Sequence, residues 1–194
     1  RSISEPAVSW NIEQIYENEN FLVINKPANL PCHPSGAFFN HTLWAWLKQA
    51  KQLPEIHLCN RIDRESSGLV IVAKSANYAN KLNKTLSMPE CEKKYICIVH
   101  GKFPDQKICQ GWIINYSKSK VRKKKCFVEN LEENHEQEKA YRASTEFKLL
   151  QYSEKKDISL LEAKLLTGRT HQIRAVLQSI NFPILGDKLY GLDE

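Results

Sequence analysis

One carboxylate stands between two guanidinium groups in residues 60–68, which read Asn-Arg-Ile-Asp-Arg-Glu-Ser-Ser-Gly. Arg61 and Arg64 flank Asp63, and a fixed cation beside a carboxylate keeps it ionised. At neutral pH, Asp63 is therefore suited to act as a nucleophile or a base rather than as an acid. If the segment enters a sheet as a strand, Arg61 and Asp63 share a face, because side chains alternate along a strand. The simpler alternative is a surface ion pair, which adds little stability.

The residues that follow this charged segment favour a functional site over a surface ion pair. Residues 69–73 read Leu-Val-Ile-Val-Ala, a continuous apolar run rich in β-branched side chains. Such a run predicts a strand buried on both faces. The charged cluster would then lie at the mouth of a buried strand.

A second group of reactive side chains lies near the end of the sequence. Residues 165–174 read Leu-Leu-Thr-Gly-Arg-Thr-His-Gln-Ile-Arg, and we expect a helix that begins at Thr170 and is capped by its side chain. The free N–H groups of the helix start, beside Arg169 and His171, would suit a phosphate. Helix capping has equal weight as the role of these two residues. Arg174 can project from the helix flank toward the sheet, although an exposed arginine is the simpler interpretation of the helix alone.

These groups need a scaffold, and the sequence predicts one with more strands than helices. The expected strands cover residues 21–24, 69–73, 94–101, 143–149 and 158–166, and the expected helices cover residues 42–50, the segment from Ser75 to Leu86, and the segment from Thr170. Residues 102–139 are expected to be rich in loops, with a basic run at 118–125 and an acidic run at 129–138. Such runs are usually solvated, although the basic one could equally contact phosphate. Because strands and helices do not alternate regularly, we predict an α+β fold with a mostly antiparallel mixed sheet flanked by helices.

Length and composition set the broad class of the protein. The 194 residues suit one domain over residues 12–194 after an N-terminal arm over residues 1–11. The sequence holds 28 Lys and Arg against 22 Asp and Glu, a mild bias toward polyanionic partners that does not prove one. The 6 cysteines show no C-x-x-C spacing, so they indicate reduced thiols and a cytoplasmic location. We also expect a monomer, and no membrane partner, because no apolar run reaches the ~18 residues of a membrane helix.

The order of several motifs resembles one known family. Residues 60–69 resemble the catalytic motif His-Arg-Leu-Asp-x-x-Thr-Ser-Gly-Leu of the RluA-type pseudouridine synthases. The similarity extends over about residues 12–191 in the family's order, which makes it far more specific than a single motif. The other similar segments are residues 22–36, 94–101, 167–174 and 183–191.

The resemblance implies a fold with a central catalytic cleft and the isomerisation of uridines in structured RNA, either ribosomal or transfer RNA. The N-glycosidic bond breaks, the base turns, and C5 bonds to the ribose, without a metal or an organic cofactor. In that scheme Asp63 attacks or stabilises C1′, and Tyr95 lies against the flipped base. Arg174 pairs with Asp63 and holds it charged, while Arg61 helps to displace the target base from its stack, which costs a few kcal/mol.

Six residues are expected to bind substrate under this resemblance. They are Arg61, Arg64, Arg169, His171, Lys26 and His33. For Lys26 and His33, a loop position near a cleft does not by itself require a substrate contact.

The sequence departs from the family pattern in two places. Asn60 stands where the family usually has histidine, so we expect different hydrogen bonding of the following loop. Ser66 replaces threonine, which is a smaller change. Relatives usually continue with further strands after the position of Glu194, so either the domain is truncated here or the lineage is short. These residues contain no S4-type RNA-binding domain.

Two other functions remain open at this point. One is a catalytically silent RNA-binding or RNA-chaperone protein with the same fold. The other is a hydrolase with paired carboxylates, for which the second acid is unassigned, since Glu65 is close to Asp63 in sequence but is expected to face elsewhere. Release of free uracil from RNA would favour the hydrolase.

Overall fold

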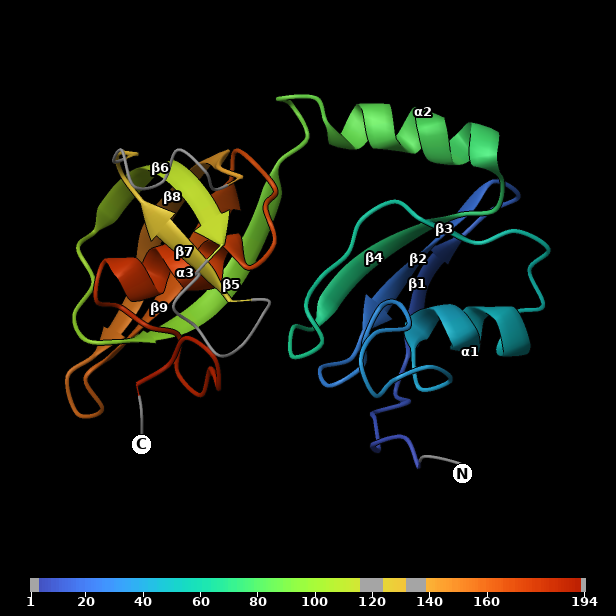
Figure 1. Ribbon diagram of the computed structural model, residues 1–194, viewed down its shortest axis with the longest axis horizontal. Coiled ribbons are helices and arrows are strands. Elements are labelled where there is room, and N and C mark those ends of the chain that lie inside the picture. Colours follow the sequence, from blue (N-terminus) through green and yellow to red (C-terminus); the bar gives the residue numbers. More distant parts are fainter. Residues whose placement is uncertain (1–3, 116–123, 132–138, 193–194) are drawn as a thin grey trace. The chain divides into compact units, whose positions relative to one another are not determined.

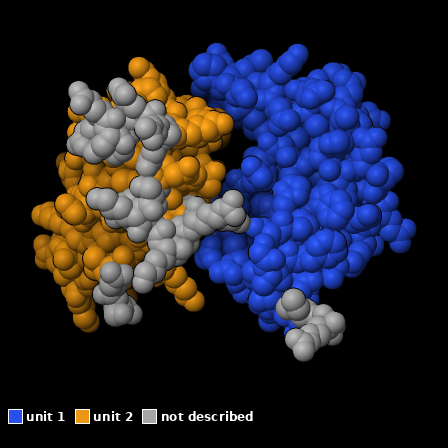
Figure 2. Space-filling view, in the orientation of Figure 1, with its two compact units in different colours: residues 1–91 blue, residues 92–194 orange. Residues whose placement is uncertain are grey.

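The chain forms two compact units, residues 1–91 and residues 92–194 (Figures 1 and 2). The structure is a computed structural model that describes residues 4–115, 124–131 and 139–192. Each unit has its own antiparallel sheet and its own apolar core, so the α+β prediction is confirmed, although in two sheets rather than one. The single catalytic domain over residues 12–194 stays a prediction, because one catalytic domain can contain two compact units.

Unit 1 carries a four-stranded sheet in the order β1-β2-β4-β3. Its strands are β1 (Glu13–Glu17), β2 (Phe21–Lys26), β3 (His57–Leu58) and β4 (Gly68–Ala73), and its helices are α1 (Leu43–Ala50) and α2 (Ala76–Leu86). Leu43 and Leu47 of α1 are buried in one core with Leu22 and Val70 of the sheet, so α1 covers one face of the sheet.

The two helices of unit 1 begin where the sequence predicts. The Thr42 side chain accepts a hydrogen bond of 3.1 Å from the Ala45 N–H, and the Ser75 side chain accepts one of 3.4 Å from the Tyr78 N–H. Both residues occupy the N-cap, where a hydroxyl satisfies an N–H group that has no partner within the helix. The expected helices over 42–50 and from Ser75 are therefore confirmed.

Unit 2 carries a five-stranded sheet in the order β5-β9-β8-β6-β7. Its strands are β5 (Lys93–His100), β6 (Gln106–Asn115), β7 (Lys125–Val128), β8 (Tyr141–Ser153) and β9 (Ile158–Leu165), and its helix is α3 (Gln172–Ser179). The helix lies across the inner face of the sheet (Figure 1), where Ala175 and Leu177 join the same core as Phe147 and Leu161. The expected strands over 94–101, 143–149 and 158–166 are confirmed.

Residues 102–139, which are expected to be rich in loops, also contain two strands that the sequence does not predict, β6 and β7. β6 pairs with β8 from Gln106 to Ile113, so a long partner strand defines it. Its own pattern is weak, since polar residues and Gly111 interrupt it. Gly111 is needed there, because an added Cβ would come within 2.3 Å of the Val128 carbonyl oxygen. Residues 116–123 and 132–138, which hold most of the basic and acidic runs, lie outside the described residues.

Two expectations about the segment around Asp63 are wrong. Residues 59–67 form a loop between β3 and β4, not a strand, so alternation does not place Arg61 and Asp63 on one face. β4 is not buried along both faces: Val70 and Val72 are fully buried, whereas Leu69 on the other face is 58% exposed. The strand belongs to an antiparallel sheet, in which one face can remain open to water.

None of the helices in the described part of the chain has the length and apolar character needed to cross a bilayer.

Candidate active site

Asn60 fastens the start of the Asp63 loop to the neighbouring strand. Its side-chain N–H donates to the Leu69 carbonyl at 2.9 Å, and its side-chain oxygen accepts from the Ile71 N–H at 2.8 Å. The Cys59 N–H adds a hydrogen bond of 2.8 Å to the Ile71 carbonyl. Asparagine offers both a donor and an acceptor, so it makes two backbone contacts at the position where the family usually has histidine.

The backbone on both sides of Asp63 is also held by side chains that lie far away in the sequence. The Cys32 thiol donates to the Ile62 carbonyl at 3.4 Å, and the Lys26 ammonium donates to the Arg64 carbonyl at 3.3 Å. A turn is closed by the Ser66 N–H, which donates to the Asp63 carbonyl at 3.2 Å. Asp63 itself is partly buried. The loop thus presents the Asp63 carboxylate from an anchored backbone.

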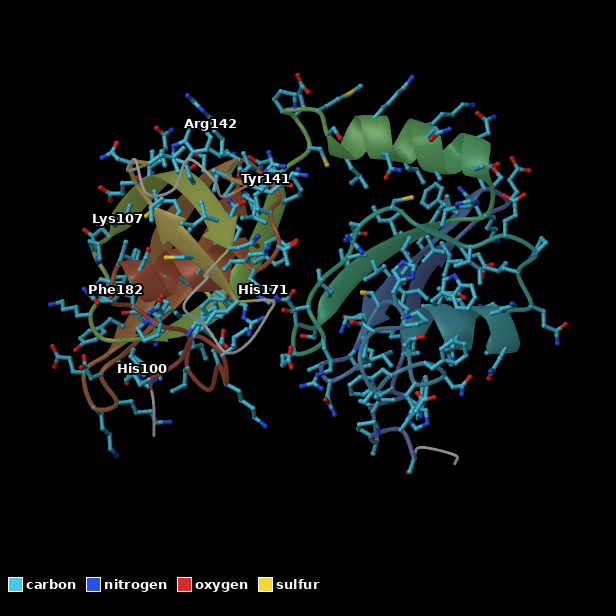
Figure 3. All side chains as sticks on the ribbon, viewed as in Figure 1. His100, Lys107, Tyr141, Arg142, His171 and Phe182 are labelled. Carbon is cyan, nitrogen blue, oxygen red and sulfur yellow. The ribbon has the colours of Figure 1, made fainter. Side chains whose placement is uncertain are left out.

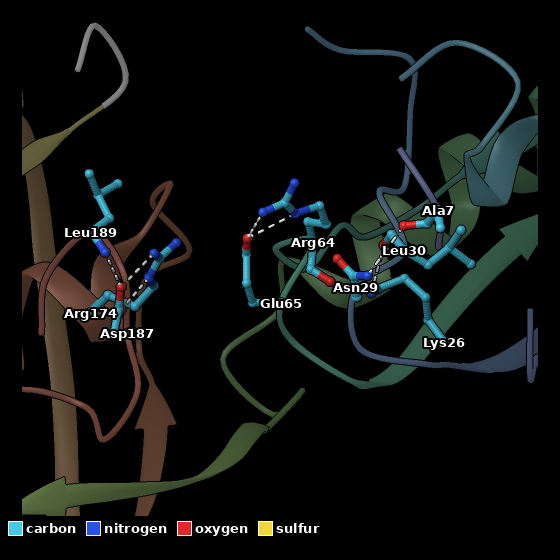
Figure 4. Close-up of polar contacts among 9 residues, drawn as sticks. All are labelled: Ala7, Lys26, Asn29, Leu30, Arg64, Glu65, Arg174, Asp187 and Leu189. Atoms are coloured by element: carbon cyan, nitrogen blue, oxygen red, sulfur yellow. Dashed lines mark hydrogen bonds and ion pairs between the residues drawn. The ribbon is translucent and has the colours of Figure 1, made fainter. Parts of the chain in front are cut away.

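Lys26 lies inside unit 1 rather than in a substrate-facing loop. It ends β2, its side chain is fully buried, and its Nζ donates to the carbonyls of Pro27 (2.8 Å), Leu30 (2.8 Å) and Arg64 (3.3 Å) (Figure 4). Burial lowers its pKa from 10.5 to about 8. The substrate contact expected for Lys26 does not fit this position, so we assign it to holding the Asp63 loop.

Three other sequence-derived candidates surround the loop in unit 1. Arg61 is exposed. Arg64 donates to the Glu65 carboxylate at 2.6 Å, and its guanidinium lies 5.3 Å from the centre of the Phe38 ring. Burial, followed by the charge of Arg61, lowers the pKa of His33, which favours the neutral imidazole at pH 7. Substrate binding by Arg61, Arg64 and His33 stays a prediction.

Tyr95 is positioned by regular secondary structure in unit 2. It lies on β5 opposite Ala163 of β9, with Cys97 and Val99 on the same face of the strand. The ring is partly buried and packs against the core of unit 2, so a rigid strand fixes its position.

Arg174 of α3 is oriented by a buried carboxylate. Its Nε donates to Asp187 Oδ2 at 2.7 Å, and its Nη2 donates to Oδ1 at 2.8 Å (Figure 4). The Asp187 side chain is only 5% exposed and also accepts the N–H groups of Leu189 at 2.9 Å and Tyr190 at 3.1 Å. Burial alone would raise the pKa of Asp187, but these hydrogen bonds outweigh it and lower the pKa. Two parallel bonds from a planar guanidinium fix its direction as well as its charge.

Tyr190 and His171 complete the surroundings of Arg174. The Tyr190 ring is 1% exposed, and the Arg174 guanidinium lies 5.0 Å from its centre. The Tyr190 hydroxyl accepts the Lys125 N–H at 2.7 Å and shares a hydrogen bond of 3.0 Å with His171 Nδ1. His171 therefore has a structural partner within unit 2.

The helix start differs from the prediction. Thr170 is not its cap, because His171 occupies the N-cap position with φ 56° and makes no capping hydrogen bond through its side chain. The buried Gln172 side chain instead organises the turn, since its Oε1 accepts from the Thr167 hydroxyl and the Arg169 N–H, both at 2.9 Å. The Arg169 side chain donates to the Arg142 carbonyl at 3.1 Å, so Arg169 does not cap the helix through its side chain either.

The residues that orient Arg174 are not predicted by the sequence. Asp187 and Tyr190 lie in residues 183–191, a segment recognised only as part of a family motif. A usable signal was present: Asp187 is an acid in a motif segment that follows Arg174 by 13 residues. Cys32 gave no comparable signal, since its contact with the Asp63 loop depends on the tertiary fold.

In the described residues, no group of His, Cys, Asp and Glu side chains has the arrangement of a metal site. Unit 1 offers an anchored carboxylate, and unit 2 offers a fixed phenol and an oriented guanidinium. A family model described as RNA pseudouridylate synthase matches residues 20–179, which include Asp63, Tyr95 and Arg174. The chain belongs to this family. The resemblance drawn from the motifs is thereby confirmed.

Relatives with assigned names are similar over nearly the whole chain. Pseudouridylate synthase RPUSD2 of Mus musculus is 34% identical over 187 residues, which cover 96% of this chain and 32% of the relative. The mitochondrial tRNA pseudouridine(32) synthase of Saccharomyces cerevisiae is 32% identical, over 97% of this chain and 39% of that relative. Ribosomal large subunit pseudouridine synthase C of Buchnera aphidicola is 31% identical, over 96% of this chain and 56% of that relative. The chain thus spans 32% to 56% of the length of these relatives.

The fold is shared with a solved human protein. The structure titled human RNA pseudouridylate synthase domain containing 1 matches with a TM-score of 0.75 and 24% identity, over 97% of this chain and 73% of that one. This likeness shows the family fold.

Proposed function

We propose that the chain isomerises specific uridines of structured RNA to pseudouridine. The observation that carries the proposal is the family match over residues 20–179, which includes Asp63, Tyr95 and Arg174. Relatives named for transfer RNA and for the large ribosomal subunit support both RNA classes as substrates.

The proposed reaction begins at the Asp63 carboxylate, which attacks or stabilises C1′ of the ribose. The bond between N1 and C1′ breaks, the base turns, and a bond forms between C5 and C1′. The C5 proton leaves and N1 gains a proton, so the product is an isomer of the substrate and the atoms balance. Such a reaction consumes no second substrate, which agrees with the expected lack of a cofactor.

The groups of unit 2 would act on the same nucleotide. Tyr95 would lie against the extruded base, and the Arg174 guanidinium, oriented by Asp187, would pair with Asp63 and keep it charged. Arg61 would help to replace the base in its stack, since extrusion of a base costs a few kcal/mol.

The test uses the full chain and transcripts of transfer and ribosomal RNA, with pseudouridine quantified after digestion to nucleosides. Asp63→Asn is expected to lower the single-turnover rate by at least about 10³-fold, because a catalytic carboxylate is lost without a change of shape. RNA binding should remain. The matched control is Asp105→Asn, an exposed aspartate of unit 2, which should stay within about twofold of the wild-type rate.

Two outcomes would replace the proposal. If the wild-type chain and Asp63→Asn bind RNA equally and neither forms pseudouridine, an RNA-binding or RNA-chaperone protein is favoured. Release of free uracil would favour the hydrolase, whose second acid is unassigned; Glu65, which is close to Asp63 in sequence, accepts a hydrogen bond from Arg64.

We further propose a monomer in a reducing compartment such as the cytoplasm, without a membrane partner. The support is that all six cysteines are free thiols, and burial raises the pKa of Cys32, Cys59, Cys97 and Cys109. The location is tested by imaging a fluorescent fusion in cells. The monomeric state is tested by measuring the molar mass of the purified chain by light scattering.

A further inference from the structure

A surface cluster of unit 2 joins cations to aromatic rings away from Arg174 and Tyr95. The Arg142 guanidinium lies 5.1 Å from the centre of the Trp112 ring, and the Arg169 guanidinium lies 5.5 Å from the centre of the Tyr141 ring. Lys139 also approaches Tyr141, with its Nζ at 5.6 Å. Arg169 Nε donates to the Arg142 carbonyl, which ties the two stacks together. We call these five residues the arginine–aromatic corner; Tyr141 and Arg142 are labelled in Figure 3.

A hollow of about 370 Å³ lies at this corner. Its lining includes Trp112, Arg142, Ser144, Thr167 and Glu129. The Ser144 hydroxyl is buried, yet it has no hydrogen-bond partner among the described residues. A buried hydroxyl without a partner is uncommon in a folded protein, and a ligand in the hollow would supply one. The volume falls in the range of small-ligand sites.

The chemistry of the corner fits a nucleotide. A guanidinium binds a phosphate through parallel hydrogen bonds, and a ring with an arginine stacked on it offers a flat surface for a base. The Ser144 hydroxyl and the Glu129 carboxylate can bond the edge of a base or a ribose 2′-hydroxyl. The net charge of +6 also favours a negatively charged ligand over a positively charged one.

The register of the sheet relates the corner to Tyr95. Tyr95 of β5 pairs with Ala163 of β9, which pairs with Phe147 of β8. Arg142 lies five positions before Phe147 on β8, a separation of roughly 17 Å along the strand at about 3.4 Å per residue, and this odd separation places it on the opposite face of the sheet from Phe147 and Tyr95. An RNA strand with its target base at Tyr95 can therefore reach the corner through neighbouring nucleotides that pass over the end of the sheet.

We propose that the arginine–aromatic corner binds a nucleotide that flanks the target uridine in the RNA substrate. The proposal rests on the proposed function and adds a contact that selects the substrate without taking part in the reaction. Arg142 supplies the phosphate contact, Trp112 beside it supplies a stacking surface on the same face of the sheet, and Tyr141 supplies a second one on the opposite face. Loss of the corner should therefore raise KM and leave kcat unchanged.

The first test compares Arg142→Gln with Lys148→Gln in the full chain. Lys148 is the matched control, since it is an exposed cation on the same face of β8 without an aromatic partner among the described contacts. The probe is a fluorescein-labelled 15-nucleotide oligouridylate, followed by fluorescence anisotropy. We expect Arg142→Gln to raise Kd by about 5- to 30-fold, because it removes a charge-assisted contact with a phosphate, and Lys148→Gln by less than about twofold. Equal effects of the two substitutions would overturn the proposal, because they would indicate general attraction to a polyanion.

The second measurement reports from the corner itself. Trp112 is the only tryptophan after residue 46, so the difference in fluorescence between the wild-type chain and Trp112→Phe isolates its signal. Oligouridylate should quench this difference signal, with the Kd found by anisotropy. An unchanged signal at saturating oligouridylate would contradict the proposal.

Assays of product separate this proposal from the proposed function. If the wild-type chain makes no pseudouridine while Arg142→Gln still weakens binding, nucleotide binding at the corner is supported and the proposed catalytic function is wrong. If pseudouridine forms and Arg142→Gln changes neither Kd nor KM, the proposed nucleotide binding at the corner is wrong and the proposed catalytic function is supported.

Discussion

The two units position their candidate groups in different ways. In unit 1, Asp63 lies on an irregular loop whose backbone is held by the side chains of Asn60, Cys32 and Lys26. In unit 2, Tyr95 and Arg174 lie on a strand and a helix, where backbone hydrogen bonds already fix the main chain. There the additional contacts fix a side chain, as Asp187 fixes the Arg174 guanidinium.

This difference indicates which contacts each unit depends on to position its candidate groups. A loop without regular hydrogen bonds needs buried side chains to satisfy and fix its carbonyl groups. An arginine on a helix needs a partner that selects one of its many rotamers. We therefore expect substitutions in unit 2 to affect one side chain strongly, and substitutions in unit 1 to loosen a whole segment.

Among the residues that position the candidate groups, Asp187→Asn should have the largest effect, because it removes the carboxylate partner of the Arg174 guanidinium, which is 16% exposed. We expect the free energy of unfolding to fall by about 3 kcal/mol, and the single-turnover rate to fall by about 10²-fold in the protein that remains folded. Chemical denaturation and rates of pseudouridine formation measure the two effects. The control Glu162→Gln removes a partly exposed carboxylate 4.0 Å from Lys94 and should change both the stability and the rate little. Equal effects of the two would mean that Asp187 does not orient Arg174.

Lys26→Met should have an intermediate effect, because three backbone carbonyls lose a buried donor. We expect the free energy of unfolding at pH 7 to fall by about 1–3 kcal/mol, and the rate to fall by about tenfold as the Asp63 loop loosens. The exposed Lys84→Met of α2 serves as the control and should match the wild type. A rate as low as that of Asp63→Asn would show that Lys26 acts in the reaction itself.

The same substitution should change the pH dependence of stability. Burial lowers the pKa of Lys26 from 10.5 to about 8, so between these values the unfolded chain binds more protons than the folded chain. Stability conferred by this group therefore rises as pH increases through that window. The difference in unfolding free energy between the wild type and Lys26→Met should grow from pH 8 to pH 10. A constant difference would contradict the burial of a charged Lys26.

Asn60→Ala should have the smallest effect of the series. It removes the hydrogen bonds to the Leu69 carbonyl and from the Ile71 N–H, and we expect a loss of about 1–2 kcal/mol in the free energy of unfolding. Asn80→Ala on the exposed face of α2 should be neutral or slightly stabilising, because alanine favours a helix. Asn60→His, which introduces the residue usual in the family, should fall between Asn60→Ala and the wild type. Thermal or urea unfolding ranks the variants.

The sequence predicts regular elements well where periodicity and capping agree. The Ser75 cap and the alternation of Ala143, Thr145 and Phe147 both correspond to elements of the structure. β6 was missed because Gly111 and polar residues weaken its pattern, and its long partner β8 supplies the order that its own residues lack. A strand defined by a distant partner gives little local signal.

The candidate site could be predicted in part from its motifs. The local pattern marked Asp63, and the family motif marked Arg174, but neither could show that Lys26 is buried, since a lysine is rarely buried without partners. Those partners are carbonyls of residues 27, 30 and 64, and only the tertiary fold brings them together. The Arg174–Asp187 pair depends in the same way on the chain after α3.

The most direct test of the central claim is a double-mutant cycle between the units, with single-turnover rates of pseudouridine formation for Asp63→Glu, Arg174→Lys and the double variant. If the unit 1 carboxylate and the unit 2 guanidinium act as a pair, the second substitution should cost little once the first is present, with a coupling energy above about 1 kcal/mol. Rates that multiply independently, to within about twofold, would contradict the account.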